Sequence, residues 1–247
     1  MKRTVLLTIL IIVVSSALNA QTLNVHFKED FVIKYTSDQV EFVDFLEEGK
    51  TIDNDHEYVD LGLPSGIKWA TCNIGANSPQ ESGDYFAWGE VDAKTSYNLN
   101  NYSFYHQFSG DDLYDELGKN ISGTQYDVAQ KAWGGTWRMP TEEEFIELLR
   151  NCSWYWKSDM NVCGFEVVGE NGNEIFLPVT GYIQDEKKFN SYNGYYWTAT
   201  SRSCDASHSF CFLIYDLIVE GFLLNYKVHG VEIGSRYIGL NIRPVLD

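Results

Sequence analysis

The chain has 247 residues, and its 35 acidic against 18 basic residues give a formal net charge of −17. This length suits one domain with an appendage, or two small domains. The negative charge would repel phosphate backbones, which argues against nucleic acid as a partner. An acidic surface alone indicates solubility rather than a specific partner.

The N-terminal segment 1–20 is typical of a secretory signal peptide. Lys2 and Arg3 precede an apolar run over 5–14, and small residues follow it. The run is too short to cross a membrane, which needs about 20 apolar residues, so no transmembrane span is expected. The mature chain from Gln21 is expected in the periplasm, at the cell surface or outside the cell. It would carry 16 basic and 35 acidic residues, a balance of −19.

A short β-hairpin is predicted after the signal peptide. Apolar residues alternate with polar ones over 23–27 and again over 31–35. So short a segment, 21–48, buries too little apolar surface to stand alone, so we expect it to dock on something. Residues 49–57 are polar and acidic and are predicted to be a linker to a main domain over 58–247.

Short strands and turns dominate this main domain. The strongest hairpin signal covers 165–179, because Asn171 and Gly172 suit the two positive φ angles of a type I′ turn. Further strands are predicted at 59–61, 67–72, 195–200, 209–215, 221–226 and 238–245.

Two helices are predicted. One covers 125–133, with Thr124 as its N-cap and Gly134 as its C-terminal stop. The other begins after Thr141, which forms a Thr-x-x-Glu capping box with Glu144. Two early helices followed by a strand-rich second half indicate an α+β fold.

The second helix opens with three consecutive glutamates, which could describe an active-site acid cluster. Glu144 belongs to the capping box, while Glu142 and Glu143 lie where negative charge favours the helix dipole by about 0.3–1 kcal/mol each. The paired acids of a glycoside hydrolase must flank a substrate, whereas adjacent helix residues point in different directions. We therefore expect these glutamates to be structural. Phe145 and Leu148 are expected to face the core.

The main domain resembles a known family, the Fibrobacter succinogenes major paralogous domain family. Six strings carry the resemblance in order: VDLGLPSGIKWATCNIGA (59–76), GDYFAWGE (83–90), AWGGTWRMPTEEEFIELL (132–149), NGNEIFLPVTGY (171–182), NGYYWTATS (193–201) and GLNIRPV (239–245). Members are exported bacterial proteins, often on the cell surface, and the domain is similar to the C-type lectin fold. The resemblance implies that the first and last strands pair, that two helices flank the sheet, and that long loops form one exposed face. It transfers no catalytic residues.

Aromatic and basic residues inside these strings are expected to build the scaffold. The tryptophans are expected in the core, and the arginines are expected to pair with carboxylates or backbone carbonyls. These residues are Trp69, Trp88, Trp133, Trp137, Arg138 and Arg243.

The sequence lacks the ligand patterns of the metal sites known in lectin-like proteins. The calcium-lectin signatures and the Asp-x-Asp-x-Asp-Gly loop are absent, and Thr198 and Ala199 follow Trp197 where a carboxamide and a carboxylate would stand. The formylglycine-generating enzyme, a relative of this fold, binds copper through two cysteines. Cys204 and Cys211 are spaced more widely than its pair, so neither a cofactor nor a catalytic residue is predicted.

The cysteines number five, so at least one thiol stays unpaired within the chain. Cys204 and Cys211 could close a hairpin, while Cys72 and Cys152 could close a long loop. Spacing leaves the connectivity open, and Cys163 has no assigned partner.

Candidate ligand contacts fall in the stretch 190–208, where the long loops of a lectin-like fold would be exposed. Loops on a rigid scaffold commonly carry binding, and mixed aromatic and polar groups suit sugar or protein contacts. The candidates are Tyr192, Tyr195, Arg202, Asp205 and His208.

The preferred interpretation is an exported, non-catalytic recognition or adhesion domain for a glycan or a surface protein. One alternative is a structural part of a cell-envelope assembly, in which the N-terminal hairpin adds a strand to a neighbour. A second alternative is a copper-dependent oxidase-like enzyme that uses Cys204 and Cys211.

Overall fold

The computed structural model describes residues 22–26, 32–36, 50–108, 111–159, 162–202, 206–215, 218–219, 222–223 and 227–247. The chain divides into two units, Met1–Glu47 and Glu48–Asp247. In the first unit, β1 (Thr22–His26) pairs antiparallel with β2 (Val32–Thr36), where the sequence alternates. The predicted signal peptide lies outside the described residues.

The second unit begins with a β-hairpin where a linker was expected. β3 (Lys50–Asp53) and β4 (His56–Asp60) pair antiparallel, and Asn54 and Asp55 turn between them at φ angles of 46° and 66°. Asn and Asp are the non-glycine residues that best tolerate this left-handed region. β3 lies at the edge of its sheet, and its residues 51 and 52 are exposed. Because neither residue is buried, the strand does not need alternating apolar residues, and the sequence gives no strand signal there.

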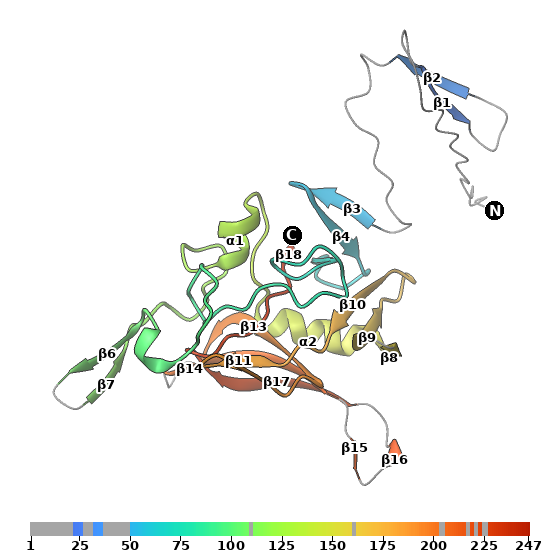
Figure 1. Ribbon diagram of the computed structural model, residues 1–247. Coiled ribbons are helices and arrows are strands. Elements are labelled where there is room, and N and C mark those ends of the chain that lie inside the picture. The colour runs from blue at the N-terminus through green and yellow to red at the C-terminus, as the bar shows by residue number, and fades with distance from the viewer. Residues whose placement is uncertain are drawn as a thin grey trace. The chain divides into compact units, whose positions relative to one another are not determined.

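The C-terminus returns to this part of the unit. β18 (Val245–Leu246) pairs with β5 (Lys68–Ala70), giving a sheet in the order β18-β5-β4-β3. The last strand therefore lies beside β5 and not beside the first predicted strand, β4. Figure 1 shows the C-terminus next to the β3–β4 hairpin.

A second sheet lies against the longer helix. β13 (Asn193–Ser201), β14 (His208–Tyr215) and β17 (Lys227–Ser235) pair in that order, and α2 (Glu142–Asn151) packs on all three strands (Figure 1). Phe145 of α2 stacks on Phe212 of β14 with ring centroids 4.6 Å apart. Phe145 and Leu148 are fully buried, which confirms the predicted apolar face.

The predicted hairpin at 165–179 is present, but its turn differs. β9 (Val162–Val168) pairs with β10 (Glu174–Pro178) and with β8 (Ser153–Asp159). The loop is 169–173, and within it only Gly172 has a positive φ, of 86°. The type I′ prediction is therefore wrong. Asn171 instead donates its side-chain N–H to the backbone carbonyl of Asp60, at 2.8 Å.

Other predicted strands are partly right. The strands expected at 195–200 and 209–215 are confirmed by β13 and β14. Within 238–245 no continuous strand forms, and only Val245 belongs to a strand, β18. The residues make isolated bridges to four segments, Leu240 to Phe86, Gly239 to Ile183, Asn241 to Tyr196, and Val245 to Arg138. The shorter elements are η1 (Leu99–Asn101), β6 (Tyr105–Phe108), β7 (Asp111–Tyr114), β11 (Tyr182–Gln184), β12 (Lys187–Phe189), β15 (Ile218–Val219) and β16 (Phe222–Leu223).

The first helix is shorter than predicted. α1 (Val128–Trp133) ends at Gly134 as expected, but its N-cap is Asp127 and not Thr124. The buried Asp127 carboxylate accepts hydrogen bonds from the backbone N–H groups of residues 123, 129, 130 and 139. Burial raises the pKa of Asp127, and these amide hydrogen bonds oppose the shift.

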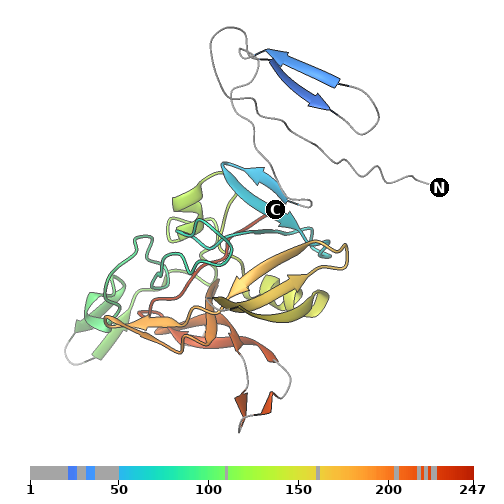
Figure 2. The same ribbon diagram turned by 45° about the vertical axis from the view of Figure 1, so that its right-hand side comes forward.

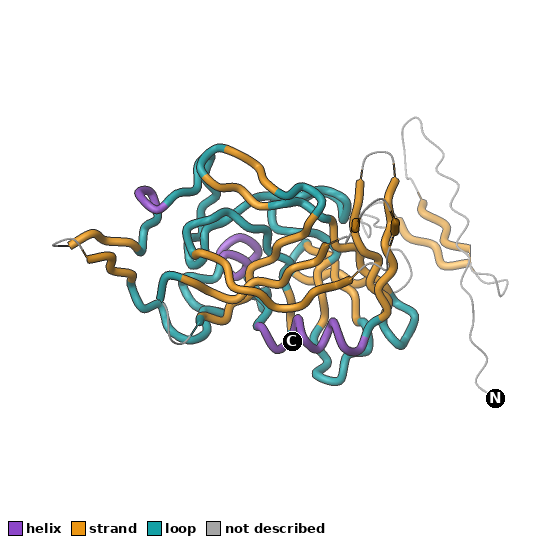
Figure 3. The backbone as a smooth tube through the Cα atoms, turned by 90° about the horizontal axis from the view of Figure 1, so that it is seen from below, coloured by secondary structure: helices purple, strands orange, loops and turns teal. Residues whose placement is uncertain are grey.

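Strands and loops make up most of the described backbone of the second unit (Figure 3). Its strand pairs are antiparallel, and it has two α-helices, so the predicted α+β class is confirmed at this level. Among the described residues, no helix combines the length and apolar character needed to cross a membrane.

Candidate ligand-binding surface

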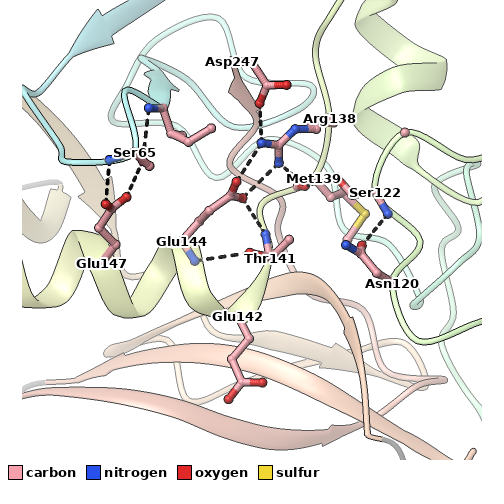
Figure 4. A network of polar contacts seen from close by, with 12 residues as sticks. Ser65, Asn120, Ser122, Arg138, Met139, Thr141, Glu142, Glu144, Glu147 and Asp247 are labelled. Carbon is pink, nitrogen blue, oxygen red and sulfur yellow. Dashed lines mark hydrogen bonds and ion pairs between the residues drawn. The ribbon is translucent and has the colours of Figure 1, made fainter.

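The three glutamates at the start of α2 do not form an acid cluster. Figure 4 shows Glu144 between Arg138 and Thr141. Thr141 Oγ1 accepts from the Glu144 N–H at 3.3 Å, and Glu144 Oε2 accepts from the Thr141 N–H at 2.8 Å, which confirms the capping box. Glu142 donates its backbone N–H to Thr200, and Glu143 is exposed. The segment therefore starts a helix.

The residues expected to build the scaffold do so. Arg243 is fully buried and donates to the carbonyls of Ala70, Thr71 and Phe176 and to Asn73 Oδ1. Arg138 binds the carboxylates of Glu144 and Asp247. Trp69, Trp88 and Trp137 are fully buried, while Trp133 is half-buried.

The candidate ligand contacts do not gather at one place. Tyr192 precedes β13 and Tyr195 lies near its beginning, whereas Arg202 follows its end and His208 begins β14. At about 3.3 Å per residue, the strand separates Tyr195 from Arg202 by roughly 20 Å. Asp205 lies outside the described residues. The predicted site is thus two groups at opposite ends of one strand.

At the far end, His208 lies between two serine side chains. Its Nδ1 is 2.6 Å from Ser207 Oγ, and its Nε2 is 3.3 Å from Ser235 Oγ. His208 is also paired with Ser235 in the β14–β17 ladder. These contacts join β14 to β17 and give His208 a structural position.

At the near end, two residues that the sequence analysis missed complete an aromatic cluster. Tyr182 of β11 and Phe189 of β12 form a cross-strand pair whose rings stack with centroids 5.4 Å apart and an interplanar angle of 20°. Tyr195 meets Tyr182 edge-on, at 5.3 Å and 83°. Phe189 is 39% exposed and Tyr192 is 76% exposed. We call these three rings, Tyr182, Phe189 and Tyr195, together with the exposed Tyr192 of the adjoining turn, the aromatic surface.

The β11–β12 hairpin presents this cluster on one of its two faces. Side chains alternate along a strand, and directly paired residues share a face. Gln184 and Lys187, which pair with each other, therefore lie on the same face as Tyr182 and Phe189. On the opposite face, the Lys188 ammonium sits 5.5 Å from the centre of the Tyr85 ring.

The tip of this hairpin is fixed to the rest of the unit. Asp185, with φ of 53°, exchanges backbone hydrogen bonds with Tyr97 at 2.8 and 2.7 Å. Figure 2 shows the orange hairpin running toward the green segment around η1. The aromatic surface is therefore anchored at both ends, by this bridge and by β13.

Two amide side chains hold the hydroxyl of Tyr195. Asn190 Nδ2 donates to Tyr195 Oη at 3.1 Å, and Asn193 Nδ2 donates to it at 3.3 Å. The turn 190–193 positions both, because the Asn193 N–H donates to the Asn190 carbonyl at 2.9 Å. Burial raises the pKa of Tyr182, with Tyr195 and Tyr237 adding to the shift, so this phenol stays protonated at neutral pH.

The described cysteines are free thiols, so the pairing of Cys72 with Cys152 is not formed. Cys152 follows α2 and packs on the core, as does Cys163, whereas Cys72 lies next to Thr71, with Thr71 Oγ1 3.6 Å from its sulfur. Cys204, the candidate partner of Cys211, lies outside the described residues, so that pairing stays a prediction.

Cys211 is poorly suited to bind a metal. Its side chain is 3% exposed, and burial raises its pKa to about 12. Metal ions are bound by the thiolate, which such a site disfavours. Within the part of the chain that the structure describes, no three His, Cys, Asp or Glu side chains are grouped to hold a metal ion.

Comparison with known proteins identifies no relative. No family model matches the chain, and neither a curated protein nor a solved structure matches it. A functional assignment therefore depends on the chemistry of the aromatic surface.

Proposed function

We propose that the protein is an exported, non-catalytic recognition or adhesion domain that binds a glycan at the aromatic surface. The observation that carries this proposal is the juxtaposition of partly exposed rings with hydrogen-bonding amides. The rings of Phe189 and Tyr192 can cover the C–H faces of a sugar, because aromatic side chains offer flat apolar area. The side chains of Asn190 and Asn193, which meet at the Tyr195 hydroxyl, supply polar groups for the sugar hydroxyls.

The dimensions of this surface favour a glycan over a protein partner. A stable protein interface buries about 800 Å² on each partner. The aromatic surface has four side chains, and only Phe189 and Tyr192 are more than a third exposed. A few sugar rings match that area, whereas a folded partner would need contacts well beyond it.

The proposal includes a C-type-lectin-like scaffold of the major paralogous domain family. Two features support it, the antiparallel sheets and the two helices, whereas the pairing of the C-terminal strand with β5 departs from the pairing of first and last strands that the resemblance implies. Export is proposed from the signal-peptide pattern of residues 1–20. In this proposal, the arginines and tryptophans of the six strings stabilise the fold and do not bind the ligand.

A binding screen on residues 21–247 tests the function. We expect saturable binding to at least one glycan on a broad array, and we expect Phe189→Ala to weaken it about tenfold or more. Tyr155→Ala is the matched control, because Tyr155 is 52% exposed on β8, outside the aromatic surface. The proposal fails if no glycan binds, or if both variants weaken binding equally. Capture of a surface protein without glycan binding would replace it with the protein-binding interpretation.

A second candidate function is a structural role in a cell-envelope assembly. The observation that favours it is the separate first unit, whose described part is the two-stranded hairpin β1–β2. An isolated two-stranded hairpin is at best marginally stable, so adding a strand from a neighbour would complete it. Deleting residues 21–47 should abolish assembly and leave the thermal unfolding of the second unit unchanged. Unaltered assembly would rule this function out.

The copper-dependent alternative has its own test. Titration of thiols in the native exported protein, with and without Cu(I), would show protection of both Cys204 and Cys211 if they bind copper. We expect no such protection, because the buried Cys211 favours the protonated thiol.

A further inference from the structure

The hydroxyl of Tyr195 is arranged as a hydrogen-bond donor. A phenol oxygen has two lone pairs and one hydrogen. Both lone pairs accept, one from Asn190 Nδ2 at 3.1 Å and the other from Asn193 Nδ2 at 3.3 Å. The hydrogen is left to donate to a ligand. This donor stands beside the Tyr182 ring, whose centre is 5.3 Å from that of Tyr195.

The charge of the protein restricts the acceptor that this hydroxyl would meet. The formal net charge is −17. The hairpin itself carries two exposed acidic residues, Asp185 and Glu186, and two exposed lysines, Lys187 and Lys188, so repulsion of an anionic ligand comes from the charge of the whole protein. Carboxylate, sulfate or phosphate groups on a glycan would be repelled. The acceptor is therefore uncharged. An amide carbonyl is the strongest uncharged acceptor that common sugars carry.

The neighbouring rings supply a place for an apolar group. Phe189 has no polar side-chain atom and is 39% exposed, and it stacks on Tyr182. A sugar hydroxyl placed there would lose hydrogen bonds to water, whereas a methyl group would gain from burial. The site thus joins a donor to an apolar face, which complements the carbonyl and the methyl of an acetamido group.

We infer that the ligand is a neutral glycan that carries acetamido groups. The Tyr195 O–H donates to the acetamido carbonyl, and the Phe189–Tyr182 pair covers the acetamido methyl. This inference depends on the proposed glycan-binding function and names its ligand class. Tyr195 is the residue that distinguishes an acetamido sugar from the same sugar with a hydroxyl in that place.

Two matched trisaccharides test the inference on residues 21–247. The β-1,4-linked trimers of N-acetylglucosamine and of glucose differ only in the acetamido group. By calorimetry, we expect the N-acetylglucosamine trimer to bind about tenfold more tightly than the glucose trimer. This difference corresponds to the free energy of about one net hydrogen bond together with a methyl contact. This comparison uses the unaltered protein, so it does not depend on the folding of a variant. Equal affinities for the two trimers would overturn the inference.

A single substitution then assigns the preference to Tyr195. Tyr195→Phe keeps the ring and removes the hydroxyl, so it should bind the acetamido trimer more weakly and reduce the tenfold preference to the part that the methyl contact supplies. Tyr155→Ala, away from the surface, should keep the tenfold preference. A Tyr195→Phe protein that retains the preference overturns the assignment.

The possible results distinguish the acetamido preference from the proposed glycan-binding function. Binding of other glycans on the array, with no preference for the acetamido trimer, overturns the inference alone. Absence of binding to every glycan overturns the proposed function as well.

Discussion

Arg138 and Glu144 form a two-pronged ion pair at the start of α2, with Nη1 2.9 Å from Oε2 and Nη2 2.7 Å from Oε1. The same carboxylate caps the helix through the Thr141 N–H, and the same guanidinium reaches Asp247 Oδ1 at 2.6 Å. The side chains of Arg138 and Glu144 are only 17% and 14% exposed, so water screens the pair weakly. The Arg138 guanidinium therefore links the start of α2 to the C-terminal residue, Asp247.

Glu144→Ala should lower the free energy of unfolding by about 3 kcal/mol, because it removes a helix cap and leaves a largely buried arginine without its main partner. Glu143→Ala is the control: Glu143 is exposed in the same turn, and its loss should cost less than about 1 kcal/mol. Urea unfolding measures both. Equal losses would show that the ion pair and the cap add nothing to stability.

Gly169→Ala should be much more damaging than Gly172→Ala, although both glycines lie in the β9–β10 loop. A Cβ atom at Gly169 would lie 2.1 Å from the backbone carbonyl oxygen of Leu61, which cannot rotate away. We expect a loss of about 3 kcal/mol or more. At Gly172 a Cβ meets nothing within 4 Å, and only its φ of 86° opposes alanine, for about 1–2 kcal/mol. Similar unfolding midpoints for the two variants would contradict the close approach of the loop to Leu61.

Local signals in the sequence predicted the start of α2, but they misplaced the N-cap of α1 and gave the wrong turn type in the β9–β10 loop. The α2 start was predictable because a capping box needs only Thr141 and Glu144, three residues apart. The β3–β4 hairpin was not, because an exposed edge strand need not alternate and because an Asn-Asp turn is a weaker signal than Asn-Gly. The segment 238–245 bridges four partners outside it, among them Phe86 and Arg138 far away in the sequence, so its apolar pattern predicted a strand that does not form.

The candidate site shows the same division. Tyr192 and Tyr195 were proposed from their place in the stretch 190–208, and the structure places Tyr195 against Tyr182, which pairs with Phe189 across β11 and β12. Nothing local in the sequence joins Tyr182 to Tyr195. The separation of His208 from them, by contrast, could have been foreseen, because strands were already predicted over 195–200 and 209–215, and a strand is extended.

Peptide mapping tests the state of the cysteines. Denaturation without reductant, followed by alkylation, should label Cys72 and Cys152, because the structure shows both as free thiols. In the native protein at about pH 8, Cys211 should stay unlabelled, since it is buried and its pKa is raised to about 12. A disulfide-linked peptide joining Cys72 to Cys152 would restore the long-loop pairing and contradict the structure.

His56 should make stability depend on pH in mildly acidic solution. Its ring lies flat on Trp133, with centroids 3.8 Å apart and 11° between the planes. Burial lowers the pKa of His56 below its ordinary value of 6.5, while Asp55 and Asp53 oppose the shift. The unfolded chain therefore binds the proton more tightly than the folded one. The contribution of His56 is complete above pH 6.5 and is lost as the pH falls through the lowered pKa.

His56→Gln removes this titration, so the loss of unfolding free energy between about pH 7.5 and about pH 5 should be smaller than in the unaltered protein. Urea unfolding at a series of pH values measures it. His106→Gln is the control, because the His106 side chain is 59% exposed and pairs with Asp115 at the surface. That variant should keep the part of the pH dependence that comes from His56. If His56→Gln leaves the slope unchanged, the ring stacked on Trp133 does not resist protonation, and the cause of the acid sensitivity lies elsewhere.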